Sequence, residues 1–123
     1  NVGALAIHPS TKDIFTGTQF TGIFRSTNNG DSWVNIGVRK PTILSIAEGP
    51  ADREIWVGTV RNGIYHTTDN GNTWIQRNNG LTNLVVSAIA VDFTTGYVFA
   101  GTDGDGVFIS TDDGDNWVQT SLD

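Results

Sequence analysis

The chain repeats one pattern three times, and this repeat limits the folds open to it more than any other feature. Three segments align without gaps, starting at Gly17, Gly58 and Gly101. The positions they share are Gly17/Gly58/Gly101, Thr18/Thr59/Thr102, Gly22/Gly63/Gly106, Thr27/Thr68/Thr111, Gly30/Gly71/Gly114 and Trp33/Trp74/Trp117. The tryptophans stand 41 and then 43 residues apart, a period typical of the blades of a β-propeller. We therefore divide the chain into three expected blades, residues 1–41, 42–83 and 84–123.

Each repeat contains four short apolar runs, which predict four β-strands. The runs expected to form the innermost strand are Leu5-Ala6-Ile7, Leu44-Ser45-Ile46 and Ile89-Ala90-Val91. The next two are Ile14–Thr16, Ile55–Val57 and Val98–Ala100, then Ile23-Phe24, Ile64-Tyr65 and Val107-Phe108, and the fourth begins at each Trp. Consecutive apolar residues fit strands covered on both faces, as in sheets stacked around an axis. The sequence predicts an all-β chain of three four-stranded antiparallel blades; a β-sandwich or an open β-solenoid of the same hairpins is the alternative.

The composition suits short strands joined by tight turns, and it excludes several functions. Gly occurs 15 times and Cys is absent, so disulfide and thiol chemistry are excluded. The net charge of -6 argues against a general affinity for nucleic acid or for anionic membranes. No apolar run approaches the ~20 residues of a membrane span. Because the chain contains no Met, we expect it to be a processed product, a fragment or a trimmed chain.

A turn motif follows the third strand of each repeat and carries a family resemblance. It reads STNNGDSW from Ser26, TTDNGNTW from Thr67 and STDDGDNW from Ser110. These segments resemble the Asp-box, or BNR repeat, written S-x-D-x-G-x-T-W, of sialidases, sortilin-type receptors, xyloglucan-cleaving enzymes and secreted bacterial propellers. The resemblance covers nearly the whole chain and implies the β-propeller fold. It implies little about activity, because one fold hosts many chemistries.

We expect the motif to serve as a structural turn. The side chain at its third position, a carboxylate in Asp69 and Asp112 but an amide in Asn28, can accept hydrogen bonds from the turn, while the Trp packs into the sheet. The residues given this structural role are Ser26, Asn28, Gly30, Trp33, Thr67, Asp69, Gly71, Trp74, Ser110, Asp112, Gly114 and Trp117. Trp74 is expected to be the best covered, because its blade has a neighbour on both sides. The aspartates around Asp112 lack the terminal Glu of an EF-hand loop, so we predict no metal site.

No catalytic set of residues can be recognised. Sialidases, which the resemblance brings to mind, use a cluster of arginines, a Tyr nucleophile with a supporting Glu, and an Asp acid/base. Here the only glutamates, Glu48 and Glu54, flank the loop between the first and second strands, at the end opposite the expected ligand face. His8 and His66 stand alone in the sequence and suit packing better than metal binding. We predict no enzymatic activity, no catalytic residue and no cofactor.

The turns between the second and third strands are the best candidates for a binding site. They read Gln19-Phe20-Thr21, Val60-Arg61-Asn62 and Asp103-Gly104-Asp105, so they differ sharply where the framework does not. An exposed Phe at a polar turn suggests a contact surface, although it can also lean on an adjacent loop. The predicted ligand-binding residues are Phe20, Arg61, Asn62, Asp103 and Asp105. A glycan, a peptide or a protein suits them equally well.

Three blades do not close a ring, so the outer faces of the first and third blades need a partner. Residues 1–41 hold four basic and two acidic residues (+2), 42–83 three and four (-1), and 84–123 none and seven (-7). Trp33 to Ser45 spans 12 residues, and six residues after Trp117 plus six to Ala6 of a second copy again give 12. We therefore expect a head-to-tail homodimer that forms a six-bladed ring. The competing explanation is a longer parent chain that holds the missing blades.

The leading functional hypothesis is a non-catalytic binding or scaffold module with a glycan ligand. A fragment of a glycoside hydrolase whose catalytic residues lie in missing blades is the first alternative, and a propeller that docks a protein is the second. The resemblance also implies a secreted, extracellular protein. No nucleic-acid or membrane partner is expected, given the acidic charge.

Overall fold

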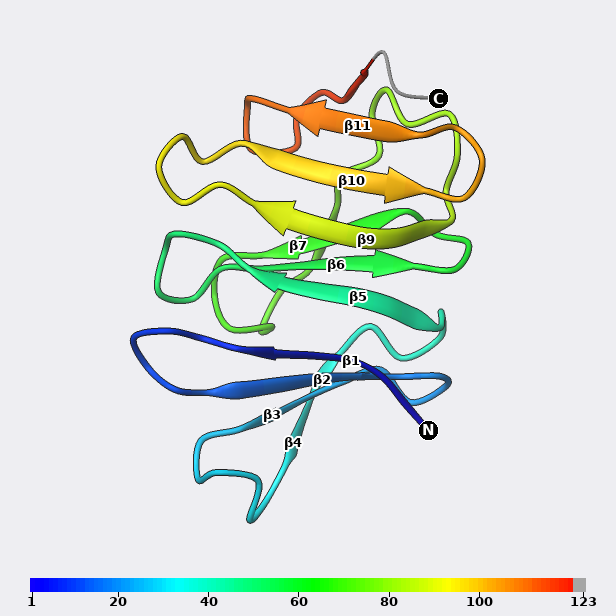
Figure 1. Ribbon diagram of the computed structural model, residues 1–123. Helices are drawn as coiled ribbons and strands as arrows, with labels where there is room; N and C mark the ends of the chain where they lie inside the picture. The colour runs from blue at the N-terminus through cyan, green and yellow to red at the C-terminus, as the bar shows by residue number, and fades with distance from the viewer. Residues whose placement is uncertain (121–123) are drawn as a thin grey trace.

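The computed structural model describes residues 1–120, which form twelve β-strands and no helix (Figure 1). Blade 1 contains β1 (Val2–Ile7), β2 (Ile14–Thr18), β3 (Ile23–Ser26) and β4 (Val34–Gly37). Blade 2 contains β5 (Ile43–Glu48), β6 (Ile55–Thr59), β7 (Ile64–Thr67) and β8 (Ile75–Gln76), and blade 3 contains β9 (Val86–Val91), β10 (Val98–Thr102), β11 (Val107–Ser110) and β12 (Val118–Gln119). Each sheet is antiparallel, with its strands in chain order. The expected all-β chain of three four-stranded sheets is confirmed.

In blade 2, the residues that correspond to the first strand of blade 1 lie two positions later in the sequence than we expected. Leu5 pairs with Thr16, and the corresponding pair in blade 2 is Ile46 with Val57. Leu5 therefore corresponds to Ile46, and the alignment with Leu44 was wrong. The error arose because a charged residue, Glu48, stands at the end of this strand and hides the apolar pattern. Ala47, which now corresponds to Ala6, follows Trp33 by 14 residues, so the 12-residue spacing gives no support to a ring.

The apolar core lies between the blades, in two separate layers. Blades 1 and 2 enclose a cluster that includes Phe15, Ile23 and Val57, and blades 2 and 3 enclose one that includes Trp56 and Phe108. Val57 and Trp56 are neighbours on β6 and face opposite sides, since side chains alternate along a strand. Both faces of blade 2 are therefore covered, which explains why β6 reads as an uninterrupted apolar run.

The turns gather at two opposite ends of the molecule. In Figure 1 the β2–β3, β6–β7 and β10–β11 turns lie at the right, and the turns that lead into β4, β8 and β12 lie at the left. The first strands β1, β5 and β9 run side by side along one edge of the stacked sheets. Within residues 1–120 there is no helix that could cross a membrane.

Candidate functional site

The three turns at the right-hand end share one closing contact. The Thr at the end of the second strand donates its hydroxyl to the carbonyl oxygen of the Gly four residues later: Thr18 to Gly22 at 2.7 Å, Thr59 to Gly63 at 2.8 Å and Thr102 to Gly106 at 2.8 Å. Each of these glycines has a positive φ, which side chains disfavour. The Thr and Gly shared by the three repeats thus fix the turn, and the residues between them are free to vary.

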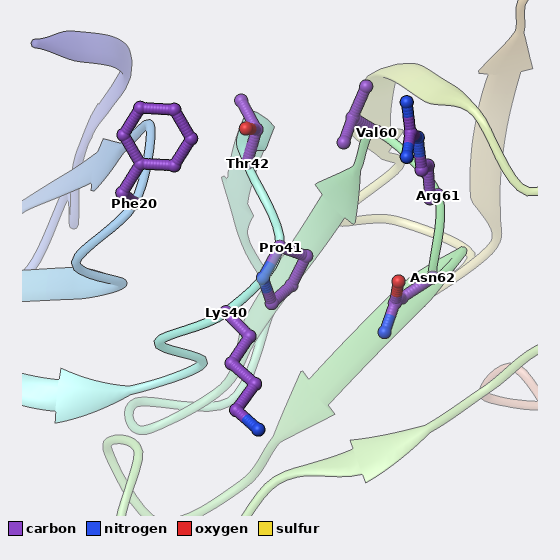
Figure 2. A pocket seen from close by; sticks show the side chains of 7 residues that line it. All are labelled: Phe20, Lys40, Pro41, Thr42, Val60, Arg61 and Asn62. Atoms are coloured by element: carbon purple, nitrogen blue, oxygen red, sulfur yellow. The ribbon is translucent and has the colours of Figure 1, made fainter.

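An open pocket of about 410 Å³ lies between the turns of blades 1 and 2 (Figure 2). We call it the inter-turn pocket; its lining residues are Phe20, Lys40, Pro41, Thr42, Val60, Arg61 and Asn62. Phe20 stands on one side and Arg61 on the other, with Pro41 between them. The pocket therefore combines side chains of two turns with the loop that joins the blades.

The loop between β4 and β5 is fixed to both turns. Thr42 donates its hydroxyl to the carbonyl of Gln19 at 2.9 Å, and its own carbonyl accepts the N–H of Val60 at 3.0 Å. Phe20 remains 72% exposed. The pocket thus has a fixed backbone and an open aromatic surface, and no loop within residues 1–120 buries Phe20.

The charge of the pocket is positive. Lys40 and Arg61 both line it, no lining residue is acidic, and neither cation forms an ion pair with another residue in the range 1–120. Figure 2 shows the ammonium of Lys40 and the guanidinium of Arg61 on opposite sides of the pocket. The amide of Asn62 donates to the hydroxyl of Tyr65 at 3.3 Å. An aromatic face with N–H donors around it can bind a polar ligand that also has an apolar face.

The pocket brings together three of the five predicted ligand-binding residues: Phe20, Arg61 and Asn62. Asp103 and Asp105 belong to the corresponding turn of blade 3 and do not line this pocket. The Asp105 carboxylate accepts the hydroxyl of Thr82 at 2.6 Å. Their role in binding stays a prediction.

The sequence comparison missed Lys40, Pro41 and Thr42. They lie in the β4–β5 loop, which falls between the aligned segments. The sequence feature that could have indicated them is a basic residue, Lys40, followed by Pro41 just before β5.

The box turns, residues 26–33, 67–74 and 110–117, lie at the opposite end and share one hydrogen-bond pattern. In blade 2, Thr67 donates its hydroxyl to Asp69 at 2.7 Å and accepts the N–H of Gly71 at 2.9 Å, and Asp69 accepts the N–H of Thr73 at 2.9 Å. The same contacts join Ser110, Asp112, Gly114 and Asn116 in blade 3, and Ser26, Asn28, Gly30 and Ser32 in blade 1. Each side chain at the third position is thus engaged by its own turn.

The Trp of the second and third box turns also contacts the preceding blade. The indole Nε1 of Trp74 donates to the carbonyl of Ile36 in β4, and that of Trp117 to the carbonyl of Arg77, both at 2.7 Å. Trp117 is only 4% exposed, Trp33 is 40% exposed, and Trp74 is intermediate. Trp74 is therefore not the best covered, although it also bonds to the blade before it.

Hydrogen bonds within the turn lower the pKa of Asp69 to about 2 from an ordinary value of 3.8. The N–H of Thr73 contributes most, followed by the hydroxyls of Thr67 and Thr73. Because the folded state binds this proton less tightly than the unfolded state, the stabilisation is complete above pH 3.8 and is lost as the pH falls through about 2.

We predict that Asp69→Asn removes this acid sensitivity without unfolding the chain. Blade 1 already has Asn28 at this position, where its oxygen accepts the N–H of Ser32 at 2.9 Å and its amide donates to the Ser32 hydroxyl at 2.8 Å. The variant should show a smaller fall in melting temperature than the wild type between neutral pH and about pH 2. Asp112, whose pKa is also lowered by its hydrogen bonds to Asn116, is unchanged in both proteins. Equal falls would contradict the assignment.

Two pairs of titratable side chains outside the turns connect neighbouring segments of one blade. Glu54 contacts His66 at 2.7 Å, and both are buried. The corresponding residues of blade 1, Asp13 and Arg25, form an ion pair. Across residues 1–120, no group of three His, Asp or Glu side chains could hold a metal ion.

Comparison with solved structures establishes the fold. A chain of the nidogen/laminin complex is similar to this chain with a TM-score of 0.80 and 19% identity, over 99% of this chain and 48% of that one. The GH74 enzyme of Niastella koreensis is similar with a TM-score of 0.76 and 20% identity, over 94% of this chain and 21% of that one. The extracellular domain of BT4673 from B. thetaiotaomicron gives a TM-score of 0.78 and 18% identity, over 100% of this chain and 17% of that one.

The chain is part of a β-propeller. It spans less than half of each of these three chains, so it is a partial propeller of three blades. The chain matches no protein-family model and no curated protein. The similar propellers include enzymes and proteins of other kinds, and the likeness therefore carries the fold alone.

Proposed function

We propose that this propeller is a non-catalytic binding module whose ligand lies in the inter-turn pocket. One observation carries the proposal: Phe20 is 72% exposed above a loop fixed by hydrogen bonds, with Arg61 and Lys40 beside it. Exposed aromatic residues with polar neighbours are typical of contact surfaces. In a rigid pocket, little conformational freedom has to be lost on binding.

Within this proposal, the ligand is a carbohydrate. A sugar ring has an apolar face that can lie on Phe20 and hydroxyl groups that can accept from Arg61, Lys40 and Asn62. The presence of glycoside hydrolases of group GH74 among the similar structures supports this choice of ligand class. The extracellular domain among them supports an extracellular location.

The test is glycan-array screening followed by calorimetry with the best-bound glycan. We predict that Phe20→Ala lowers affinity about tenfold or more, as expected when an aromatic contact at the centre of a site is removed. Phe93→Ala is the matched control, because Phe93 is also exposed, at 47%, but lies in the β9–β10 turn at the opposite end. Equal affinity of the two variants for the glycan would contradict binding at the inter-turn pocket. If no glycan binds, the proposal that the ligand is a carbohydrate is wrong.

A second candidate is a propeller that docks a protein, and the match to a chain of the nidogen/laminin complex favours it. A pocket with an exposed Phe and an Arg has residue types that often dominate protein interfaces. The same two variants distinguish the candidates: binding to a peptide library, with no glycan binding, that is lost in Phe20→Ala but kept in Phe93→Ala supports docking.

A fragment of a glycoside hydrolase is a third candidate, which the GH74 structures favour. On this reading the catalytic residues lie in blades outside these 123 residues. Hydrolysis by a longer parent chain, with none by the present chain, is the result that would support it.

We also propose that the uncovered blades are closed by a second copy, giving a head-to-tail ring. Residues 1–41 carry a net charge of +2 and residues 84–123 one of -7. Head-to-tail pairing places these oppositely charged blades beside each other, which favours association in this orientation. Additional blades of a longer chain are the competing means of closure.

A further inference from the structure

The outward face of blade 1 is exposed at positions where the other blades are buried. Val2 is 61% exposed, whereas the residues with the same pairing in blades 2 and 3, Ile43 and Val86, are 1% and 0% exposed. Val2, Thr16, Thr18, Phe24 and Trp33 line an apolar hollow of about 360 Å³. We call these five residues the front face. In blades 2 and 3 the preceding blade covers the corresponding face.

Trp33 is the part of the front face whose missing contact can be named. Trp74 and Trp117 each donate to the backbone carbonyl of a residue three positions after the box Trp of the preceding blade. Trp33 makes no such contact within residues 1–120, and it is 40% exposed. The repeat thus indicates what covers a box Trp, namely the last strand of another blade and the residues next to it.

The outward face of blade 3 has an open position beside Gly101, where the first strand of another blade would fit. A Cβ atom on Gly17 would collide with Ile43 of the next blade, and one on Gly58 would lie 2.6 Å from the carbonyl oxygen of Val86. A Cβ atom on Gly101 would meet only Ala88 of its own blade, at 3.5 Å. In this repeat, the Gly makes room for the first strand of the following blade.

The residues around Gly101 show the same exposure. Phe99 is partly exposed, whereas its counterparts Phe15 and Trp56 are 1% exposed. Val107 is also partly exposed, whereas Ile23 and Ile64 at its position are 0% exposed. We call Ala88, Phe99, Gly101 and Val107 the rear face.

We infer that the front face of one copy binds the rear face of a second copy, with Val2 placed against Gly101 and the Trp33 indole packed beside the end of blade 3. This inference rests on the proposed head-to-tail pairing and names the residues that make it. The contacts reproduce those between blades within the chain, and the charges of +2 and -7 on the two end blades favour this occupant. Two such junctions related by a two-fold axis close the ring.

Gly101→Leu tests the inference because it adds bulk where only a second copy would be in the way. Gly101 is not at a positive φ, and its own blade leaves ordinary space for a side chain. Thr94→Leu is the matched control: it adds a similar side chain at an exposed position in the β9–β10 turn. Circular dichroism establishes that both variants keep their strand content. Light scattering after gel filtration then gives the mass of each.

The wild type and Thr94→Leu should have about twice the 13.2 kDa chain mass, and Gly101→Leu should have the mass of one chain or require at least about tenfold higher concentration to associate. Trp33→Ala should weaken association from the other face. A wild-type dimer unaffected by Gly101→Leu and Trp33→Ala would overturn the inference and leave the head-to-tail proposal to be reassessed. A wild type with the mass of one chain would overturn both and indicate further blades as the occupant, while ligand binding at the inter-turn pocket would be unaffected.

Discussion

Trp117→Ala is expected to lower the free energy of unfolding by about 3 to 5 kcal/mol, the usual cost of deleting a large buried aromatic side chain. Trp117 is 4% exposed, packs edge-on against Trp56 with ring centroids 6.4 Å apart, and donates to the carbonyl of Arg77 at 2.7 Å. The substitution therefore removes apolar contact and leaves a carbonyl without its donor. Denaturant unfolding at fixed protein concentration measures the loss.

Ile75→Ala is the control for this prediction. Ile75 lies on β8 and is 52% exposed. Its replacement by Ala should lower the free energy of unfolding by less than about 1 kcal/mol, since removing an exposed side chain leaves little cavity. A loss below about 1 kcal/mol for Trp117→Ala as well would mean that the blade 2–blade 3 contact contributes little to the stability of the fold.

Removing the carboxyl group of the buried Glu54–His66 pair is expected to lower the free energy of unfolding by about 1 to 3 kcal/mol, the cost of leaving a buried polar group without its hydrogen-bond partner. The two side chains are 8% and 3% exposed and 2.7 Å apart, and the His66 ring stacks on Trp56 at a centroid distance of 3.7 Å. Glu54→Ala therefore leaves a polar ring in the core between blades 2 and 3. Denaturant unfolding again measures the loss.

Replacing both members of the pair by apolar residues provides the matched rescue for this prediction. Tyr97 and Ile109 occupy the positions of Glu54 and His66 in blade 3, but Tyr97 is 38% exposed there, so the buried site needs an apolar residue in place of the Tyr. The double variant Glu54→Leu/His66→Ile should recover much of the stability lost in Glu54→Ala, because it leaves no buried polar group without a partner. A double variant less stable than Glu54→Ala would contradict this explanation.

The sequence predicted the sheets and the turns because these features depend on local residues. Gly with positive φ, the Thr before it and the short apolar runs act within a few positions of one another, and they recur three times. The number of strands, their order and the place of the box turns could all be worked out from this repetition.

Contacts between blades could not be predicted in the same way. The burial of Trp117 depends on Arg77 of another blade, 40 residues away, and nothing beside Trp117 in the sequence indicates it. The alignment of β5 failed because Glu48 stands at an otherwise apolar position. The pocket was found in part, since Phe20 and Arg61 vary between repeats, but Lys40 reaches it from a loop outside the repeated segments.

The central claim is that the two open faces are covered by a second copy, and the melting temperature measured against protein concentration tests it most directly. When folding and pairing are coupled, mass action stabilises the native state as the concentration rises. We predict that the melting temperature rises steadily between about 1 and 100 µM chain, and that Gly101→Leu abolishes this dependence. A melting temperature that stays constant over this range, in a wild type that remains fully folded, would contradict the account.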